Sequence, residues 1–306
     1  MEKDLISIDS RIQIKAGLGA VISISAEIHP GVEIEDHVEI KSHVTIEDGV
    51  LIGAASIISP GARIGFGTRI GKNVRVDSNV CFISSNPEKS QMSTVVGNQV
   101  HIGANSTILP GIKIGNNSTI EPGSVVKQSI PANAIVSGNP AVIVGYNGMR
   151  SNNDELTLAG DKTTKVHPLD VGSCVLYELP WVSDMRGHLS VAEYGQTLPF
   201  ISQRCFWVFN VPNEEVRGEH AHKTLHQYLI CVHGSISVVL DDSQKRQEVR
   251  LDKPNLGLYL PPLIWGIQYK HTHDAVLMVL ASDVYDSQDY IRDYDEFVDY
   301  VRNRKK

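Results

Sequence analysis

The first half of the chain returns an apolar residue, almost always Ile or Val, to every sixth position. The series is Ile22, Ile28, Ile34, Ile40, Ile46, Ile52, Ile58, Ile64, Ile70, Val76 and Phe82, and it resumes with Val96, Ile102, Ile108, Ile114, Ile120 and Val126. An amphipathic helix would need apolar spacings of three and four, which this stretch lacks. Because alternate residues of a strand face the same side, each six-residue unit predicts one short strand and a turn.

Turn residues fall in phase with this repeat. Pro-Gly pairs at 30–31, 60–61, 110–111 and 122–123 follow the repeat residue at the same distance, and these residues form tight corners. Three units close one triangular coil, so seventeen repeat positions predict five to six coils. Between Phe82 and Val96 the chain carries eight residues more than one unit requires. Such an excursion is typical of a loop on the binding face of a solenoid.

Beyond residue 165 the pattern changes to short alternating or apolar runs separated by turns. Seven runs predict strands, at residues 173–179, 187–194, 205–211, 226–232, 235–241, 256–262 and 275–281. Strands at this spacing indicate a small sandwich or barrel. Residues 287–306 have apolar positions at helical spacing and predict a short C-terminal helix. We therefore expect an all-β protein with a parallel β-helix over residues 1–146, a polar linker over 147–165 and a β-barrel over 166–306.

Composition and charge exclude several classes of function. The formal net charge of −7 offers no basic surface for nucleic acid. No run of eighteen apolar residues occurs, and the N-terminal sequence MEKDLISIDS lacks the features of a signal peptide. The four cysteines form no CxxC pair, so we expect them to be reduced. These observations predict a cytoplasmic protein that binds neither membranes nor nucleic acid.

Two histidines in the second half carry the clearest chemical signal. His220 and His222 are two positions apart, so on a strand both project from one face. Imidazoles exchange protons near neutral pH, and a facing pair can serve as acid and base. The alternatives are a metal site and two hydrogen-bonded residues of a barrel wall. The side chains expected to converge on the pair are Arg204, Arg217, Gln227, Tyr228 and Trp265.

The repeat itself, and above all residues 95–141, resembles the hexapeptide-repeat acyltransferases, whose β-helix is left-handed. The resemblance implies a homotrimer in which acetyl-CoA lies along the prism and the amine of a nucleotide-linked sugar attacks the thioester. It implies a sugar or amine contact from Asn86, in the excursion. His101 points outward on the prism, where an imidazole can contact the substrate as a general base. A plain loop turn and a surface histidine are the respective alternatives. The cosubstrate contacts that it implies are Gly103, Ala104, Lys127 and Pro140.

The second half resembles the nucleotide-sugar 3,4-ketoisomerases, which are cupins. The segments that carry the resemblance are SDMRGHLSVAEY, LPFISQRCFWVFNV, RGEHAHK, GLYLPPLIW and VLASDVYDSQDYIRDYDEF. It implies action on dTDP-4-keto-6-deoxyglucose, with His220 and His222 as the catalytic pair and their roles as acid and base unassigned. Metal-binding cupins add a Glu to the HxH pair, but Gln227 stands in its place here, so we expect no metal.

Other residues of the second half take their expected roles from the same resemblance. Arg204 and Arg217 would contact the diphosphate or the sugar. Family members differ near the positions of His188 and Gln268, and His188 favours a galactose-configured product over a glucose-configured one.

The two resemblances meet on one pathway. A pyridoxal-phosphate-dependent aminotransferase would convert the 3-keto sugar to a dTDP-3-amino-3,6-dideoxyhexose, which the first half would acetylate for a surface polysaccharide such as lipopolysaccharide. Two alternatives stay open: the barrel could be a non-catalytic sugar-binding module, or the β-helix could be only a trimerising scaffold. A 3,5-epimerase is a third. Pairing of the barrels would build an assembly larger than the trimer.

Overall fold

Two-residue strands dominate the N-terminal half of the computed structural model, and longer antiparallel strands the C-terminal half. The structure describes residues 15–84, 93–151, 163–213 and 215–304. The chain divides into two compact units, Met1–Asn147 and Gly148–Lys306, each described here by itself. The all-β architecture expected from the sequence is confirmed.

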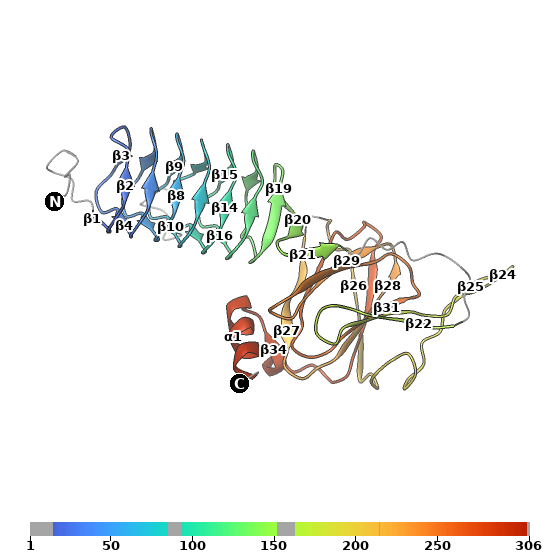
Figure 1. The fold of residues 1–306 in the computed structure, drawn as a ribbon. Helices are drawn as coiled ribbons and strands as arrows, with labels where there is room; N and C mark the ends of the chain where they lie inside the picture. The colour runs from blue at the N-terminus through green and yellow to red at the C-terminus, as the bar shows by residue number, and fades with distance from the viewer. Residues whose placement is uncertain (1–14, 85–92, 152–162, 214, 305–306) are drawn as a thin grey trace. The chain divides into compact units, whose positions relative to one another are not determined.

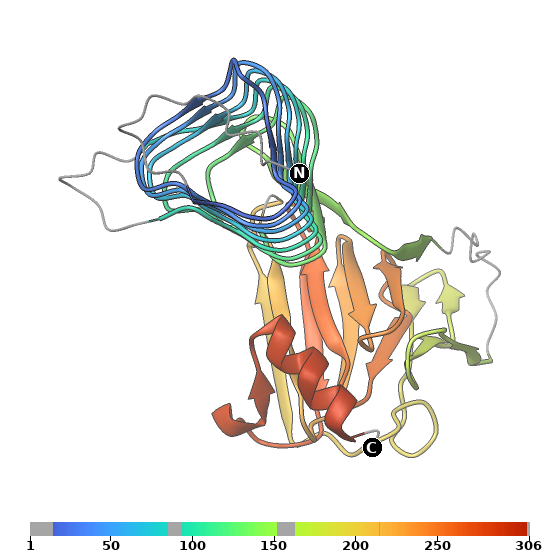
Figure 2. The ribbon, with the colours of Figure 1, turned by 60° about the vertical axis from the view of Figure 1, so that its left-hand side comes forward.

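The N-terminal unit is a parallel β-helix with three faces, seen nearly along its axis in Figure 2. The first face stacks β1 (Lys15–Ala16), β4 (Glu33–Ile34), β7 (Leu51–Ile52), β10 (Arg69–Ile70), β13 (Val95–Val96) and β16 (Lys113–Ile114). The second stacks β2 (Val21–Ile22), β5 (Glu39–Ile40), β8 (Ile57–Ile58), β11 (Arg75–Val76), β14 (His101–Ile102), β17 (Thr119–Ile120), β19 (Ala134–Ser137) and β20 (Val142–Tyr146). The third stacks β3 (Glu27–Ile28), β6 (Thr45–Ile46), β9 (Arg63–Ile64), β12 (Cys81–Phe82), β15 (Thr107–Ile108) and β18 (Val125–Val126).

The six-residue repeat maps directly onto these strands. Each repeat residue from Ile28 onward is the buried second residue of its strand, whereas the first residue faces outward or is half-buried. Neighbouring coils pair in register eighteen residues apart, as Glu33 pairs with Leu51. Small residues permit this stacking: a Cβ at Gly53 would lie 2.5 Å from the carbonyl carbon of Gly71. The strands β1 to β18, three to a coil, give six turns.

The C-terminal unit packs two six-stranded sheets against each other. One sheet has the order β21 (Met149–Ser151), β30 (Arg246–Leu251), β29 (Ile236–Asp241), β32 (Trp265–Tyr269), β27 (Arg217–His222) and β34 (Tyr290–Ile291). The other has the order β22 (Lys165–Pro168), β23 (Val175–Glu178), β31 (Leu256–Leu260), β28 (Gln227–His233), β33 (Val276–Ala281) and β26 (Arg204–Phe209). The hairpin β24 (Val182–Asp184) and β25 (Gly187–Leu189), the 3₁₀ helix η1 (Ser287–Asp289) and α1 (Tyr294–Arg304) complete the unit (Figure 1).

Two apolar layers hold this unit together. Residues such as Leu229, Val238 and Leu277 form the core between the sheets. On the outer side of the first sheet, α1 packs through Phe297, whose ring centroid lies 5.5 Å from that of Trp265. Phe297 is fully buried, and burying such a side chain stabilises the fold by about 2–3 kcal/mol.

Several details differ from the sequence predictions. The strands β27, β30 and β32 lie outside the seven predicted runs, because their mixed polar and apolar residues hide the alternation. The predicted run 187–194 forms a strand only over Gly187–Leu189, and β21 lies within the expected linker. The C-terminal helix is present as α1 and begins at Tyr294 rather than residue 287. Within the described ranges, no helix has the length and apolarity that a bilayer-spanning segment needs.

Candidate active site

A bulge in β27 aims the two histidines. In the pairing of β27 with β32, Gly218 lies opposite Ile267 and His220 lies opposite Gly266. These partners are consecutive on β32, so Glu219 is the extra residue of the bulge. Gly218 and Glu219 have φ angles of 84° and 53°. A Cβ on Gly218 would lie 2.6 Å from the carbonyl oxygen of Gly266, so this position requires glycine. Beyond the bulge, the imidazoles of His220 and His222 lie side by side, with ring centroids 4.9 Å apart.

His222 is the more deeply buried of the two. Its Nδ1 lies 2.8 Å from Oδ2 of Asp289, and its Nε2 lies 3.3 Å from the amide nitrogen of Gln227. A carboxylate only accepts hydrogen bonds, so Nδ1 carries the proton and Nε2 keeps its lone pair. Burial and the neighbouring His220 lower the pKa of His222 to about 4, even though Asp289 acts in the opposite direction. The ring is therefore neutral at pH 7, as a general base must be.

His220 adopts the same tautomer through a different partner. Its Nδ1 donates to the carbonyl oxygen of Gly218, at 2.9 Å. Burial lowers the pKa of His220 as well. The ring of Tyr290 contacts both imidazoles, with centroid distances of 4.9 Å to His220 and 4.3 Å to His222. Each imidazole therefore keeps its Nε2 as a hydrogen-bond acceptor.

Arg204 supplies a positive charge to this site. Its guanidinium lies over the rings of Phe206 and Tyr285, at 5.3 and 5.6 Å from their centroids. Nε and Nη2 are buried and have no hydrogen-bond partner among the described residues. The ring of Tyr285 in turn lies 5.7 Å from that of Tyr290, which contacts both histidines, and the charge of Arg204 contributes to the lowered pKa of His222. An unpartnered guanidinium beside two neutral imidazoles is suited to bind an anion.

Two glutamines and a second arginine also belong to the predicted set of site residues. Gln227 lies on β28, where alternate residues Leu229 and Cys231 belong to the core between the sheets. Gln268 is buried on β32 and pairs with Arg217 on one side and with Val238, a core residue, on the other. Arg217 is exposed. Gln227 and Gln268 thus share the interior side of their sheets with the histidines.

Three residues of the predicted set do not lie with the histidines, and these expectations are corrected. Tyr228 is buried in a separate cluster with Leu179, Leu198 and Ile230, on the opposite face of β28 from Gln227. Trp265 packs against α1. His188 is exposed on the hairpin β24–β25, where it contacts Ser183 and Trp181. Both ribbon views place this hairpin on the side of the unit away from α1 and β34 (Figures 1 and 2).

The sequence analysis missed one segment of the site. The segment that surrounds the histidines and Arg204 contributes Tyr285, Asp289, Tyr290 and Arg292. The guanidinium of Arg292 lies over the ring of Tyr290, 4.3 Å from its centroid. The segment reaches the site because β34 pairs with β27, with Tyr290 opposite His222. Its alternation of charged and aromatic residues predicts the start of a helix, and a strand of two residues leaves no detectable pattern.

In the N-terminal unit, His101 faces outward on the second face and is half exposed. Its Nε2 lies 2.9 Å from Oδ2 of Asp77, which also accepts a hydrogen bond of 2.8 Å from Nε of Arg75. Burial raises the pKa of Asp77, but the hydrogen bonds from Arg75 and His101 outweigh this and lower it overall. The pair joins two successive coils, because β11 and β14 are adjacent.

The other predicted residues of this unit are less distinctive. A Cβ at Gly103 would lie 2.6 Å from the backbone nitrogen of Pro122, so stacking of coils by itself explains this glycine. The carbonyl of Ala104 accepts a hydrogen bond from the backbone N–H of Gly123. Lys127 and Pro140 are exposed. Asn86 lies outside the described residues.

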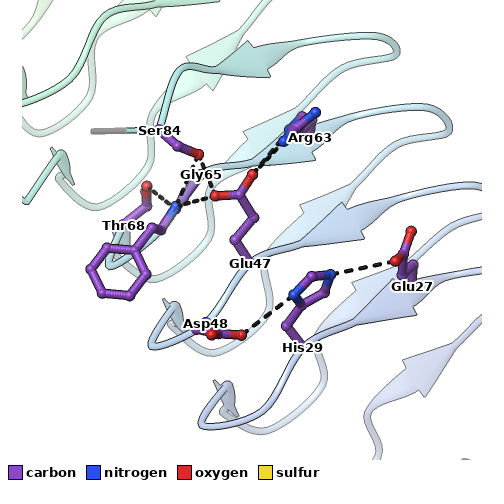
Figure 3. A network of polar contacts seen from close by, with 9 residues as sticks. Glu27, His29, Glu47, Asp48, Arg63, Gly65, Thr68 and Ser84 are labelled. Atoms are coloured by element: carbon purple, nitrogen blue, oxygen red, sulfur yellow. Dashed lines mark hydrogen bonds and ion pairs between the residues drawn. The ribbon is translucent and has the colours of Figure 1, made fainter. Parts of the chain in front are cut away.

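A polar network lies where the interruption of the repeat begins (Figure 3). Glu47 accepts hydrogen bonds from the guanidinium of Arg63, from the backbone N–H of Phe66 and from the hydroxyl of Ser84. These bonds lower the pKa of Glu47, although burial alone would raise it. Ser84 is the last described residue before the excursion, so Glu47 fixes the position from which the excursion leaves the third face. His29 forms a separate contact with Glu27 and Asp48.

Comparison with known proteins separates the two units. Residues 172–302 match the family model described as FdtA, WxcM-like, C-terminal. Residues 93–128 match the bacterial transferase hexapeptide model, and residues 43–81 the hexapeptide repeat of succinyl-transferase. The TDP-4-oxo-6-deoxy-alpha-D-glucose-3,4-oxoisomerase of Aneurinibacillus thermoaerophilus is 46% identical over 120 residues, which cover 39% of this chain and 86% of that protein.

Matches to acetyltransferases are shorter. The 2,3,4,5-tetrahydropyridine-2,6-dicarboxylate N-acetyltransferase of Clostridium perfringens is 38% identical over 55 residues, 18% of this chain and only 23% of that protein.

Among solved structures, the sugar 3,4-ketoisomerase QdtA of Thermoanaerobacterium thermosaccharolyticum in complex with TDP is 37% identical, with a TM-score of 0.42, covering 43% of this chain and 96% of that chain. A 3,4-ketoisomerase of Helicobacter canadensis is 36% identical, with a TM-score of 0.41, covering 42% and 97%.

Proposed function

Since this chain belongs to the FdtA, WxcM-like family through its residues 172–302, we propose that its C-terminal unit is a 3,4-ketoisomerase of dTDP-4-keto-6-deoxyglucose. The product is a dTDP-3-keto-6-deoxyhexose. One observation carries the proposal: two neutral imidazoles lie side by side, each with Nδ1 tied to an acceptor, beside a guanidinium with unpartnered N–H groups.

The isomerisation moves two protons between neighbouring positions of the sugar. Nε2 of His222 removes the proton from C3, and the electron pair of the C–H bond forms the C3–C4 double bond while O4 becomes an oxyanion. Arg204 is positioned to stabilise that charge. His220 takes the proton from the O3 hydroxyl and returns it to O4. The imidazolium of His222 then gives its proton to C4, which leaves a ketone at C3.

The surroundings of His222 favour this residue as the base that removes the proton from C3. When His222 is protonated, its positive charge lies against the carboxylate of Asp289. Among the described residues, Nδ1 of His220 has the carbonyl of Gly218 as its one hydrogen-bond partner, and Arg292 disfavours a positive charge there. His220 is therefore suited to exchange protons between oxygens, which requires less basicity than removal of a proton from carbon.

We extend the proposal to a galactose-configured product at C4. Gln268 is buried on the interior side of β32, and in this proposal it contacts the sugar. His188 is exposed on the hairpin β24–β25, where it contacts Ser183, so the proposed configuration rests on the resemblance alone and not on a contact from His188. The coupling constants of the product at C4 decide between the two configurations.

For the N-terminal unit we propose acetyl-CoA-dependent N-acetylation of the derived dTDP-3-amino-3,6-dideoxyhexose. The hexapeptide matches and the short acetyltransferase matches support it, and His101 backed by Asp77 offers a base for the attacking amine. A separate pyridoxal-phosphate-dependent aminotransferase supplies that amine. The proposal includes a homotrimer of the β-helix, a cytoplasmic location and a role in lipopolysaccharide synthesis.

Two assays test the proposed pair of activities. Proton NMR of dTDP-4-keto-6-deoxyglucose incubated with the full chain should show the 3-keto product and its C4 coupling constants. Substrate that binds but stays unchanged would indicate a sugar-binding module instead. Release of free CoA thiol on adding acetyl-CoA and the 3-amino sugar nucleotide should show the transferase; no release would leave the β-helix as a scaffold.

A further inference from the structure

Asp289 lies at the end of η1 and both its carboxylate oxygens have defined partners. Oδ2 lies 2.8 Å from Nδ1 of His222. Oδ1 accepts two hydrogen bonds from Thr224, one from the backbone N–H and one from the hydroxyl, each 2.8 Å long. The carboxylate is nearly buried, with 11% of the side chain exposed. Its orientation is therefore fixed by three donors.

The backbone around Asp289 is held just as firmly. The N–H of Lys223 donates to the Asp289 carbonyl oxygen at 2.9 Å, and Nζ of Lys223 donates to the carbonyl of Gln288 at 2.7 Å. Strand β34 begins at the next residue, where Tyr290 pairs with His222. The turn after β27 and the segment that carries Asp289 thus form one rigid support behind the imidazole of His222.

We infer that Asp289 is a positioning residue for the isomerisation: it fixes His222 in the tautomer whose unprotonated Nε2 can accept the proton from C3. The inference rests on the proposed function of the barrel. It explains why a residue outside the HxH motif is buried in the site, and it separates the two histidines. Both share a tautomer, but only His222 has a carboxylate behind it.

The substitution Asp289→Asn tests this directly, because the structure predicts how the amide will orient. The two donors of Thr224 require an acceptor at Oδ1, so the amide oxygen takes that place and the NH₂ group faces Nδ1 of His222. The amide then donates to Nδ1, and the ring proton moves to Nε2. The variant keeps the shape of the site but presents an N–H group where the base is needed.

Two readouts are expected to change in Asp289→Asn. The kcat of isomerisation should fall about 10²–10⁴-fold while KM stays within about threefold, because the lost group acts on the base and not on the sugar. Nitrogen-15 NMR should show Nδ1 of His222 protonated in the wild-type chain and Nε2 protonated in the variant. A role confined to stability would change neither the tautomer nor kcat.

Asp286→Asn is the matched control. Asp286 lies in the same segment and caps η1 by accepting from the backbone N–H of Gln288 at 2.8 Å. Asn caps helices about as well as Asp, so this variant should keep kcat within about twofold.

The outcomes separate the inference from the proposed function. A wild-type chain with His222 protonated at Nε2, or an Asp289→Asn variant that keeps kcat within about threefold, would overturn the inference. The wild-type spectrum decides even if the variant does not fold. A wild-type chain that binds the sugar nucleotide without isomerising it would overturn the proposed function, while the spectrum would still report whether Asp289 sets the tautomer.

Discussion

The shortest His–Asp contacts of the two units, among the described residues, differ chiefly in their surroundings. His101 and Asp77 lie 2.9 Å apart on an outer face of the β-helix, with 45% and 21% of their side chains exposed. His222 and Asp289 lie 2.8 Å apart inside the barrel unit, with 5% and 11% exposed. The first pair joins adjacent coils, whereas the second joins residues 67 positions apart in sequence. The same contact is thus half solvated in one unit and shielded from water in the other.

Burial changes what such a pair can do. Inside the barrel unit, water screens the nearly buried charge of Asp289 only weakly, so this carboxylate affects the neighbouring imidazole more than it would in solvent. On the β-helix, solvent weakens the effect of Asp77 on His101. We therefore expect the barrel chemistry to depend strongly on single residues, and the transferase chemistry to depend more on positioning of its substrates.

The largest effect is expected from His222→Asn. The variant removes the base that takes the C3 proton, so kcat of isomerisation should fall about 10³-fold or more. CoA release in the acetyltransferase assay should be unchanged, since that reaction belongs to the other unit. An isomerisation rate within about tenfold of wild type would contradict the assignment of His222.

A smaller loss is expected from Arg204→Met. It keeps much of the side-chain volume but removes the charge that stabilises the oxyanion at O4, so kcat should fall about 10²-fold. Arg204→Lys is the matched control and should lose less, because it retains the charge. Equal losses in both variants would show that the planar guanidinium matters rather than its charge.

His101→Asn removes the half-exposed pair and should lower the rate of acetyl transfer about tenfold. This is less than the 10²–10⁴-fold typical of a general base, because positioning of the substrates supplies most of the rate. Isomerisation should not change. A measurement of CoA release at saturating acetyl-CoA tests this. A loss as large as that of His222→Asn would remove the distinction between the two pairs, and no loss would indicate that substrate positioning suffices.

Glu219→Gln should give the smallest effect, a gain in stability. Oε1 of Glu219 is buried in the bulge without a hydrogen-bond partner among the described residues, and burial raises its pKa above 4.5. Because the pKa is higher in the native chain, the native chain holds this proton more tightly than the unfolded chain, so wild-type stability falls as pH rises above the unfolded-state pKa. The variant should be more stable by about 1 kcal/mol at pH 8 in urea unfolding, with the gain shrinking toward pH 4.5.

The difference between the units also explains how far the sequence predicts them. The β-helix makes its contacts between neighbouring coils, so a period of six defines its strands, corners and core. In the barrel, the spacing of His220 and His222 predicts their common face. The same alternation puts Tyr228 on the opposite face of its strand from Gln227, so the sequence pattern itself excludes Tyr228 from the interior. Asp289 could not be predicted, because it reaches His222 only through the pairing of two-residue strand β34 with β27.

The most direct test of the account is hydrogen exchange at C3 of dTDP-4-keto-6-deoxyglucose in deuterated water, followed by NMR with the wild-type chain. We predict loss of the C3 proton signal together with appearance of the 3-keto product, and neither change with His222→Asn. A sugar nucleotide that binds the wild-type chain and keeps its C3 proton would contradict the central claim that these paired imidazoles move a proton from C3 to C4.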